Sequence, residues 1–192
     1  MTILFKYQNP FWLLLIQTII LFGLKNLYAQ NITPEKAISI AYNKDEKTGN
    51  QIQLEHINQE LENIFKATDN TFNRYWLSYG LYNQALLAGI QKNEVRAEFL
   101  IDRAIELLNP LKEDSESLAL LSLEQGYSTQ FKGFFSTISI GRNAVLNALI
   151  AAELSPNSLR ANFAVAINDF YTPKIFGGGK LTLQYLKKAL KE

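Results

Sequence analysis

The chain has 192 residues, 47% of them apolar and 12% aromatic, which suits one packed domain or a short repeat array and excludes a disordered chain. Its net charge is +1 and no basic cluster is present, so the composition argues against a nucleic-acid-binding protein. The chain contains no cysteine, which excludes disulfides, thiolate catalysis and zinc sites built on cysteine.

The N-terminal segment has the layout of a secretory signal peptide. Lys6 precedes an apolar run over residues 11–24, and a polar exit ends at Ala29. The run has 14 residues, whereas a membrane-spanning helix needs about 20. We therefore expect a signal peptide over residues 1–29, cleaved after Ala29; the alternative is an uncleaved membrane anchor. Either way the remaining chain would be exported, periplasmic or secreted, and we expect no further membrane-length segment after residue 30.

Helix signals recur along the rest of the chain, whereas strand signals do not. Thr33, Pro34 and Glu35 give an N-cap, a proline at the first helical position and an acid in the first turn. They predict a short helix to about Tyr42, followed by a polar loop over residues 43–50. Apolar residues spaced three and four apart then predict helices over about residues 51–67, 72–90, 97–108, 115–131, 136–154, 157–171 and 180–190.

Particular residues set several of the predicted helix ends. Asp114 can cap the helix that follows it, and Ser136 or Thr137 can cap the next one. Pro110 and Pro156 stop the helices before them, because proline lacks a backbone N–H and clashes with the preceding turn. The chain is therefore expected to consist of helices joined by short breaks.

Small residues recur at matched intervals. Ala97 and Ala104 are seven residues apart, and the same spacing recurs 47 residues later at Ala144 and Ala151. The glycine at Gly80 is likewise followed by another 46 residues later. Antiparallel helices approach closely only where one of them lacks bulk, so this register predicts helical hairpins packed side by side. The alternative is chance, since alanine is common in helices.

This spacing resembles the tetratricopeptide repeat. In that family a tryptophan precedes a glycine by four residues in the first helix, two alanines seven apart lie in the second, and a proline ends the unit. Trp76 and Gly80 match the first helix, and Ala97, Ala104 and Pro110 match the second. The gap between Gly80 and Ala97 is 17 residues, about five more than in the family pattern, so the repeats are divergent.

The resemblance implies an all-α fold, an antiparallel helix-hairpin solenoid of about three to four units over residues 51–192. An N-terminal helix and loop over residues 30–50 would precede it. A second likeness lies in residues 171–180, where a proline precedes a Phe-Gly-Gly-Gly-Lys turn. This segment is similar to small exported bacterial repeat proteins, including periplasmic helical-repeat subunits associated with some solute transporters.

The sequence offers little for catalysis or for a metal. A P-loop would need glycine and Ser/Thr where Lys174 and Leu181 stand, so the glycines are interpreted as a tight turn. His56 is the only histidine and is expected at the surface, so we expect no metal site and no cofactor. We also expect that the protein is not an enzyme. A Ser-Lys or paired-carboxylate site stays open as an alternative, without a local signature.

Candidate binding residues follow from the repeat register. In the tetratricopeptide family the first helix of each unit lines a concave groove, and the position four residues after the small residue holds an amide here: Gln84, Gln130 and Asn168. A ladder of amides suits an extended peptide backbone; the alternative is an ordinary solvated helix face. Other residues expected to face the groove are Arg74, Tyr127 and Asp169, with Leu77, Leu81, Leu123, Phe131 and Val165 as apolar neighbours. Trp76 and Tyr79 are expected in the core.

The sequence therefore favours a non-enzymatic binding or scaffolding module of the bacterial cell envelope, which engages a protein or peptide partner. The alternative is a carrier of a small apolar ligand enclosed by Tyr75, Tyr79 and Tyr127. In the last helix, Leu183, Leu186 or Leu190 is expected to stay uncovered, as a docking edge or a homodimer contact.

Overall fold

A computed structural model describes residues 32–111 and 113–190, and these residues form an all-α fold. The predicted fold class is thereby confirmed at this level, since the described residues contain helices and no strand. The predicted signal peptide over residues 1–29 lies outside the described residues. The elements are α2 (Pro34–Thr48), α3 (Ile52–Ala67), α4 (Thr71–Ile90), α5 (Glu94–Leu108), α6 (Ser115–Ser128), η1 (Thr129–Phe131), α7 (Phe134–Leu154), α8 (Leu159–Tyr171), η2 (Lys174–Phe176) and α9 (Thr182–Ala189).

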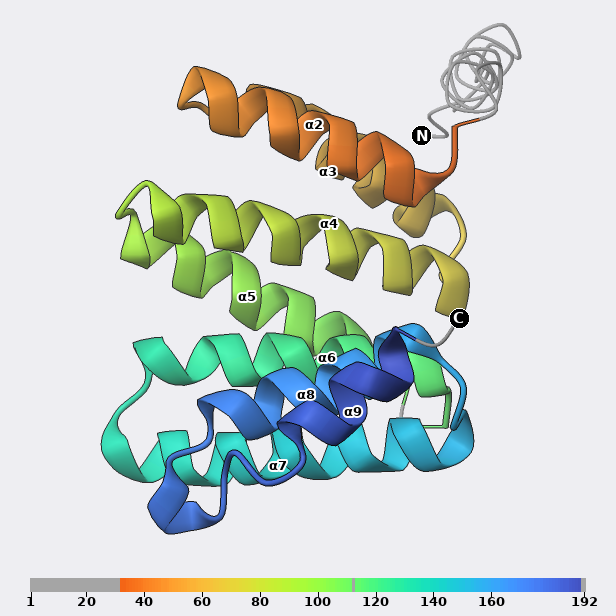
Figure 1. Ribbon diagram of the computed structural model, residues 1–192. Coiled ribbons are helices and arrows are strands. Elements are labelled where there is room, and N and C mark those ends of the chain that lie inside the picture. Colours follow the sequence, from red (N-terminus) through yellow and green to blue (C-terminus); the bar gives the residue numbers. More distant parts are fainter. Residues whose placement is uncertain (1–31, 112, 191–192) are drawn as a thin grey trace, which may run out of the picture. The chain divides into compact units, whose positions relative to one another are not determined.

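Consecutive helices from α3 to α9 pack against one another (Figure 1). The closest pairs are α4 with α5, α6 with α7 and α8 with α9, and each pair runs antiparallel. Contacts of α3 with α4, α5 with α6 and α7 with α8 join one pair to the next, and α6 also contacts α8. Antiparallel pairs follow from the short breaks between helices, which leave no chain for a long crossover.

The small residues predicted to mark helix contacts are buried. Ala97, Ala104, Ala144 and Ala151 are at most 1% exposed. At Gly80, an added Cβ would lie 2.1 Å from Oδ1 of Asn58 on the neighbouring helix. The matched register therefore reflects positions where a larger side chain would separate the helices.

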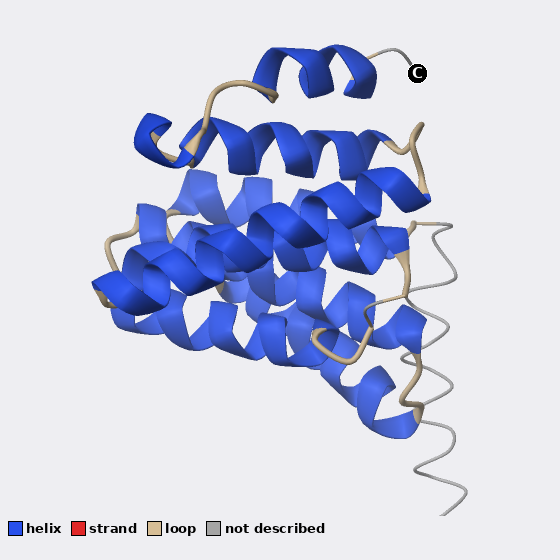
Figure 2. Cartoon of the chain, turned by 90° about the horizontal axis from the view of Figure 1, so that it is seen from below, coloured by secondary structure: helices blue, strands red, loops and turns tan. Residues whose placement is uncertain are grey.

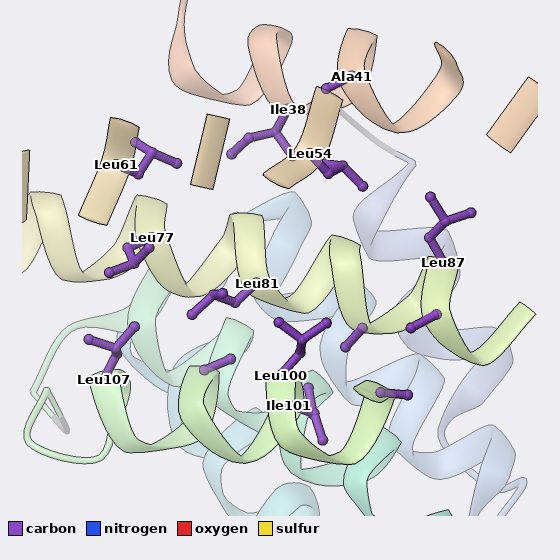
Figure 3. Close-up of a cluster of buried hydrophobic side chains, with 14 residues drawn as sticks. Ile38, Ala41, Leu54, Leu61, Leu77, Leu81, Leu87, Leu100, Ile101 and Leu107 are labelled. Carbon is purple, nitrogen blue, oxygen red and sulfur yellow. The ribbon is translucent and has the colours of Figure 1, made fainter. Parts of the chain in front are cut away.

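Buried aliphatic side chains from α2 to α5 form the first core cluster (Figure 3). Ile38, Leu54, Leu77 and Ile101 are each fully inaccessible within it. A second cluster joins α6, α7 and α8. Trp76 and Tyr79 are partly buried against the core, which confirms their predicted packing role. Such aliphatic burial is the main source of stability for a fold without cross-links.

The predicted loop over residues 43–50 is wrong, because α2 continues to Thr48. Asp45 explains the difference: its carboxylate accepts hydrogen bonds from the backbone N–H groups of Gln53 (3.1 Å) and Leu54 (2.8 Å). This side chain is 1% exposed and lies one helical turn beyond the expected end. It therefore caps α3 from within α2, so the end of α2 was extended by a tertiary contact.

Two helix starts test the predicted caps. Asp114 accepts a hydrogen bond from the backbone N–H of Ser117 at 2.8 Å, which confirms its predicted role. The predicted caps at Ser136 and Thr137 are wrong, because α7 begins at Phe134. The Thr137 hydroxyl oxygen instead lies 3.1 Å from the carbonyl oxygens of both Thr129 and Lys132, which share its single proton. Gly133 supplies the extended backbone before the helix.

Helix α7 corrects one further expectation. It has 21 residues with a mean hydropathy of 1.2, long and apolar enough to cross a membrane on these two criteria. The expectation that no membrane-length segment follows residue 30 is therefore wrong. One face of α7 is buried through Ala144, Ala148 and Ala151. Only 17% of the most apolar stretch of this helix is buried, however.

Of the three leucines that could be uncovered at the last helix, α9, two are exposed and Leu186 is half-buried. Leu183 is 65% exposed and Leu190, its C-cap, is 83% exposed, whereas Tyr185 packs against the second core cluster. The docking edge or homodimer contact expected there stays a prediction.

Candidate binding groove

The predicted amide ladder is not presented at a surface. Gln84 is 2% exposed and Asn168 is 7% exposed, whereas Gln130 is exposed. The expectation that the three amides line one groove is therefore wrong. Gln84 and Asn168 are turned toward neighbouring helices, and each amide finds its own hydrogen-bond partners inside the protein.

Gln84 belongs to a chain of buried amides. Its Oε1 accepts from Nδ2 of Asn58 at 2.8 Å, and its Nε2 donates to Oε1 of Gln51 at 3.2 Å. Gln51 in turn donates to Oε1 of Gln91 at 2.9 Å. Gln84 and Gln51 both donate and accept, so the chain links α3 and α4, whereas Asn58 only donates and its buried Oδ1 has no hydrogen-bond partner. Gln84 is therefore structural.

Asn168 and Asp169 also have structural roles, at the end of α8. Asn168 donates to the carbonyl of Ala164 at 3.0 Å and contacts the face of α6 that is left free by Gly126. Asp169 Oδ2 accepts from the backbone N–H groups of Leu181 (2.8 Å) and Thr182 (2.7 Å). The expected groove role of both residues is wrong.

The pKa of Asp169 reflects these contacts. Burial by itself raises the pKa of the carboxyl, but the hydrogen bonds from the Thr182 hydroxyl (2.6 Å) and from the backbone at the start of α9 outweigh it and lower the pKa below its usual value. A carboxylate in this position stabilises the positive end of the helix. Asp169 is therefore an ionised cap that fixes the start of α9 against α8.

Arg74 lies away from the other candidates. Its guanidinium pairs with Asp69, with Nε 2.5 Å from Oδ1, and lies 5.4 Å from the ring centroid of Phe65. Arg74 stands in the first turn of α4, whereas Tyr127 and Gln130 stand at the end of α6, at the opposite end of the hairpins (Figure 1). The six predicted residues therefore do not form one site.

Two of these six residues do meet, together with Phe131 from the predicted apolar neighbours, in an open groove of about 430 Å³. Tyr127 and Gln130 form part of its wall. The whole lining comes from α2, from the end of α4 and the start of α5, and from the end of α6 with η1: Tyr42, Leu86, Gly89, Ile90, Glu94, Tyr127, Gln130 and Phe131. We call this set the α4–α6 groove.

Tyr127 is held rigidly in the α4–α6 groove. Its hydroxyl donates to the carbonyl of Ala85 at 3.1 Å, and its ring packs edge-on against Phe131 with centroids 5.5 Å apart. A Cβ at Gly89 would lie 2.3 Å from the Tyr127 oxygen, so glycine at this position admits the phenol. Burial raises the pKa of Tyr127, which therefore remains a neutral phenol.

The chemistry of the α4–α6 groove is that of a binding surface. Ile90 is 62% exposed and gives an apolar wall, Gln130 an amide, and Glu94 an exposed carboxylate at the rim. The part of the chain that the structure describes contains no group of three His, Cys, Asp or Glu side chains suited to a metal. His56 is exposed, as predicted, with Glu60 3.8 Å away. The groove can hold an apolar side chain of a bound segment and can hydrogen-bond to the backbone of that segment.

No known family matches this chain. Among the curated proteins and the solved structures, none is significantly similar to it either. The likeness to tetratricopeptide repeats therefore rests on the residues of this chain alone.

Sequence reasoning missed most of the groove lining. Tyr42 was placed at the last residue of a short helix, and Leu86, Ile90 and Glu94 carried no motif. The sequence signal for this groove was Gly89, because a glycine at that position leaves room for an aromatic side chain from a neighbouring helix.

A second depression, of about 320 Å³, lies beside the α2–α3 turn and contains the capping Asp45.

Proposed function

We propose that this protein is a non-enzymatic binding module, which holds a segment of a protein or peptide in the α4–α6 groove. The observation that carries the proposal is the groove itself: a rigid tyrosine and exposed apolar and amide side chains converge there from three helices. A rigid aromatic side chain beside an apolar wall is typical of the anchor positions of interfaces.

The groove chemistry favours a particular kind of segment. Leu86, Ile90 and Phe131 favour an apolar anchor residue, because covering them removes apolar surface from water. Gln130 can donate to and accept from an extended backbone. Glu94 at the rim favours a basic residue beside the anchor.

The wider setting belongs to the same proposal. The hairpins would form a divergent tetratricopeptide-type solenoid of three to four units, following a signal peptide cleaved after Ala29, in the bacterial cell envelope. The buried alanines at matched intervals support the repeat, and the charged, apolar and small-residue layout of residues 1–29 supports export.

Site-specific photocrosslinking in the host cell tests the binding function. A benzoylphenylalanine at Gln130 should crosslink to a defined protein, whereas the same group at Gln59, an exposed position on α3, should not. Ile90→Arg should abolish the crosslink from residue 130, because it places a charge on the apolar wall. Equal crosslinking from both positions, or none from either, would contradict the proposal.

The second candidate is a carrier of a small apolar ligand. The observation in its favour is the groove volume of about 430 Å³, which lies within the range of small-molecule sites. Native mass spectrometry of protein purified from its host separates the two: a retained small molecule that is lost in Ile90→Arg supports the carrier.

A further inference from the structure

The start of α7 and the segment after α8 carry unusually exposed apolar side chains. Among the large apolar residues that the structure describes, Ile175 (86%) and Phe135 (85%) are the most exposed. Their apolar neighbours are also exposed, and together we call them the aromatic tips: Phe134 and Phe135 at the start of α7, Phe170 and Tyr171 at the end of α8, and Ile175 and Phe176 in η2. Several exposed large apolar side chains grouped in this way indicate an interaction site.

The two groups of tips project from the same end of the hairpins. The turn from α6 to α7 and the turn from α8 to α9 both lie at this end (Figures 1 and 2). Since α7 and α8 are antiparallel neighbours, the start of one and the end of the other face the same side. One extended surface can therefore contact both groups at once.

Charge identifies the kind of surface. Residues 125–152 and 170–191 contain no aspartate and no glutamate. Two lysines, Lys174 in η2 and Lys180 before α9, lie close to Ile175 in the chain, whereas Lys187 and Lys188 lie in the last turn of α9. Lys174 and Lys180, which flank Ile175, are exposed. Lys132 is already paired, with Nζ 2.8 Å from Glu98 and 2.7 Å from Asp102. The tips therefore combine apolar side chains with two exposed cations, and the acidic side chains beside them, Glu98 and Asp102, are paired with Lys132.

We propose that the aromatic tips dock the protein on an anionic lipid bilayer. The side chains of the tips enter the boundary between headgroups and acyl chains, while Lys174 and Lys180 contact the headgroups. A bilayer fits better than a protein partner because the tips are protruding turns, which a soft interface accepts without a matching cavity. The docking is independent of the α4–α6 groove, which uses other residues.

Single-cysteine labelling tests this docking directly, because the chain has no cysteine of its own. Phe135→Cys and Ile175→Cys carry a polarity-sensitive fluorophore, and Phe72→Cys and Leu154→Cys, at the opposite end of the hairpins and also exposed, are the controls. The full chain is used throughout, so the leader contributes equally to every variant. The probe is a vesicle of phosphatidylcholine with or without phosphatidylglycerol.

On vesicles that contain phosphatidylglycerol, the labels at 135 and 175 should shift to the blue and be quenched by brominated lipid, whereas those at 72 and 154 should not. Lys174→Glu with Lys180→Glu should weaken vesicle binding on the order of tenfold or more. Labels at 135 and 175 that remain in water, or a shift at all four positions, would overturn the proposal. A shift that needs only higher protein concentration would assign the surface to a second copy of the chain. Equal binding to both vesicles would overturn the role of the anionic lipid.

Discussion

Ser78 on α4 and Glu124 on α6 are joined in the protein interior, with Ser78 Oγ 2.6 Å from Oε1 of Glu124. Both side chains are fully inaccessible. The Ser78 hydroxyl has one proton and also lies 2.8 Å from the carbonyl oxygen of Ala104, which can only accept. If Ser78 donates to Ala104, Glu124 must donate to Ser78, and this requires a protonated carboxyl. Burial raises the pKa of Glu124 to about 8, although the hydrogen bond with Ser78 lowers it in part.

The protonated Glu124 predicts that the protein is more stable at mildly acidic than at mildly alkaline pH. The unfolded carboxyl titrates near pH 4.3, roughly, and the folded one near about 8. The stability that the protonated Glu124 contributes is therefore fully present below the unfolded pKa and is lost as the pH rises through the folded pKa. The loss should be on the order of a few kcal/mol, and thermal melts followed by circular dichroism at about pH 5 and about pH 8, two values within this range, would measure most of it.

Glu124→Gln separates this group from the rest of the chain. The amide keeps a donor toward Ser78 and cannot ionise, so the melting temperature of the variant should change much less over the same range. Glu94→Gln, at an exposed carboxylate, is the matched control and should keep the pH dependence of the parent. An unchanged pH dependence in Glu124→Gln would show that another group is responsible.

Gly178 is required by a close backbone approach. A Cβ at this position would lie 1.9 Å from the carbonyl oxygen of Thr172, and neither atom belongs to a flexible side chain. Gly178→Ala should therefore destabilise the protein by about 2 kcal/mol or more, measured by urea unfolding.

Gly141, in α7, is the matched comparison. It has no atom within 4 Å of an added Cβ, so Gly141→Ala should stabilise the protein by about 0.5–1 kcal/mol. Equal effects would contradict the assignment.

The ionised carboxylate of Asp169 is expected to stabilise the protein, and this contribution should disappear in acid. Its lowered pKa means that the contribution is present above the unfolded pKa and is lost as the pH falls through the folded value. Asp169→Asn should cost about 1–2 kcal/mol at neutral pH, and the difference from the parent should vanish in strong acid. Hydrogen exchange of the Thr182 amide, which donates to this carboxylate, should accelerate in the variant. A difference that persists in acid would assign the effect to packing.

Substitutions at Gln84 and at Ile90 should affect stability and binding separately. Gln84→Ala leaves the buried Nδ2 of Asn58 without its acceptor, so unfolding should become easier by about 1–3 kcal/mol. Binding through Gln130 should survive while the variant is folded. Ile90→Arg should do the reverse, since Ile90 is exposed and contributes little to the core. If Gln84→Ala abolished the crosslink without loss of stability, the amide would have a binding role after all.

Local sequence was sufficient for the class of the fold and for most helix boundaries. Periodic apolar residues, Pro110 and the cap at Asp114 act within one or two turns, so their effect can be predicted without the neighbouring helices. The spacing of alanines also identified the buried contact positions, because lack of bulk is a property of the residue itself.

The tertiary structure alone decided what the polar residues do. Gln84, Asn168 and Asp169 have the same helical register that suggested a groove, yet neighbouring helices bury all three. The end of α2 was likewise set by a contact of Asp45 with the next helix. The physical reason is that a polar side chain takes its role from the partner it meets, and a sequence read helix by helix does not specify which face meets which neighbour.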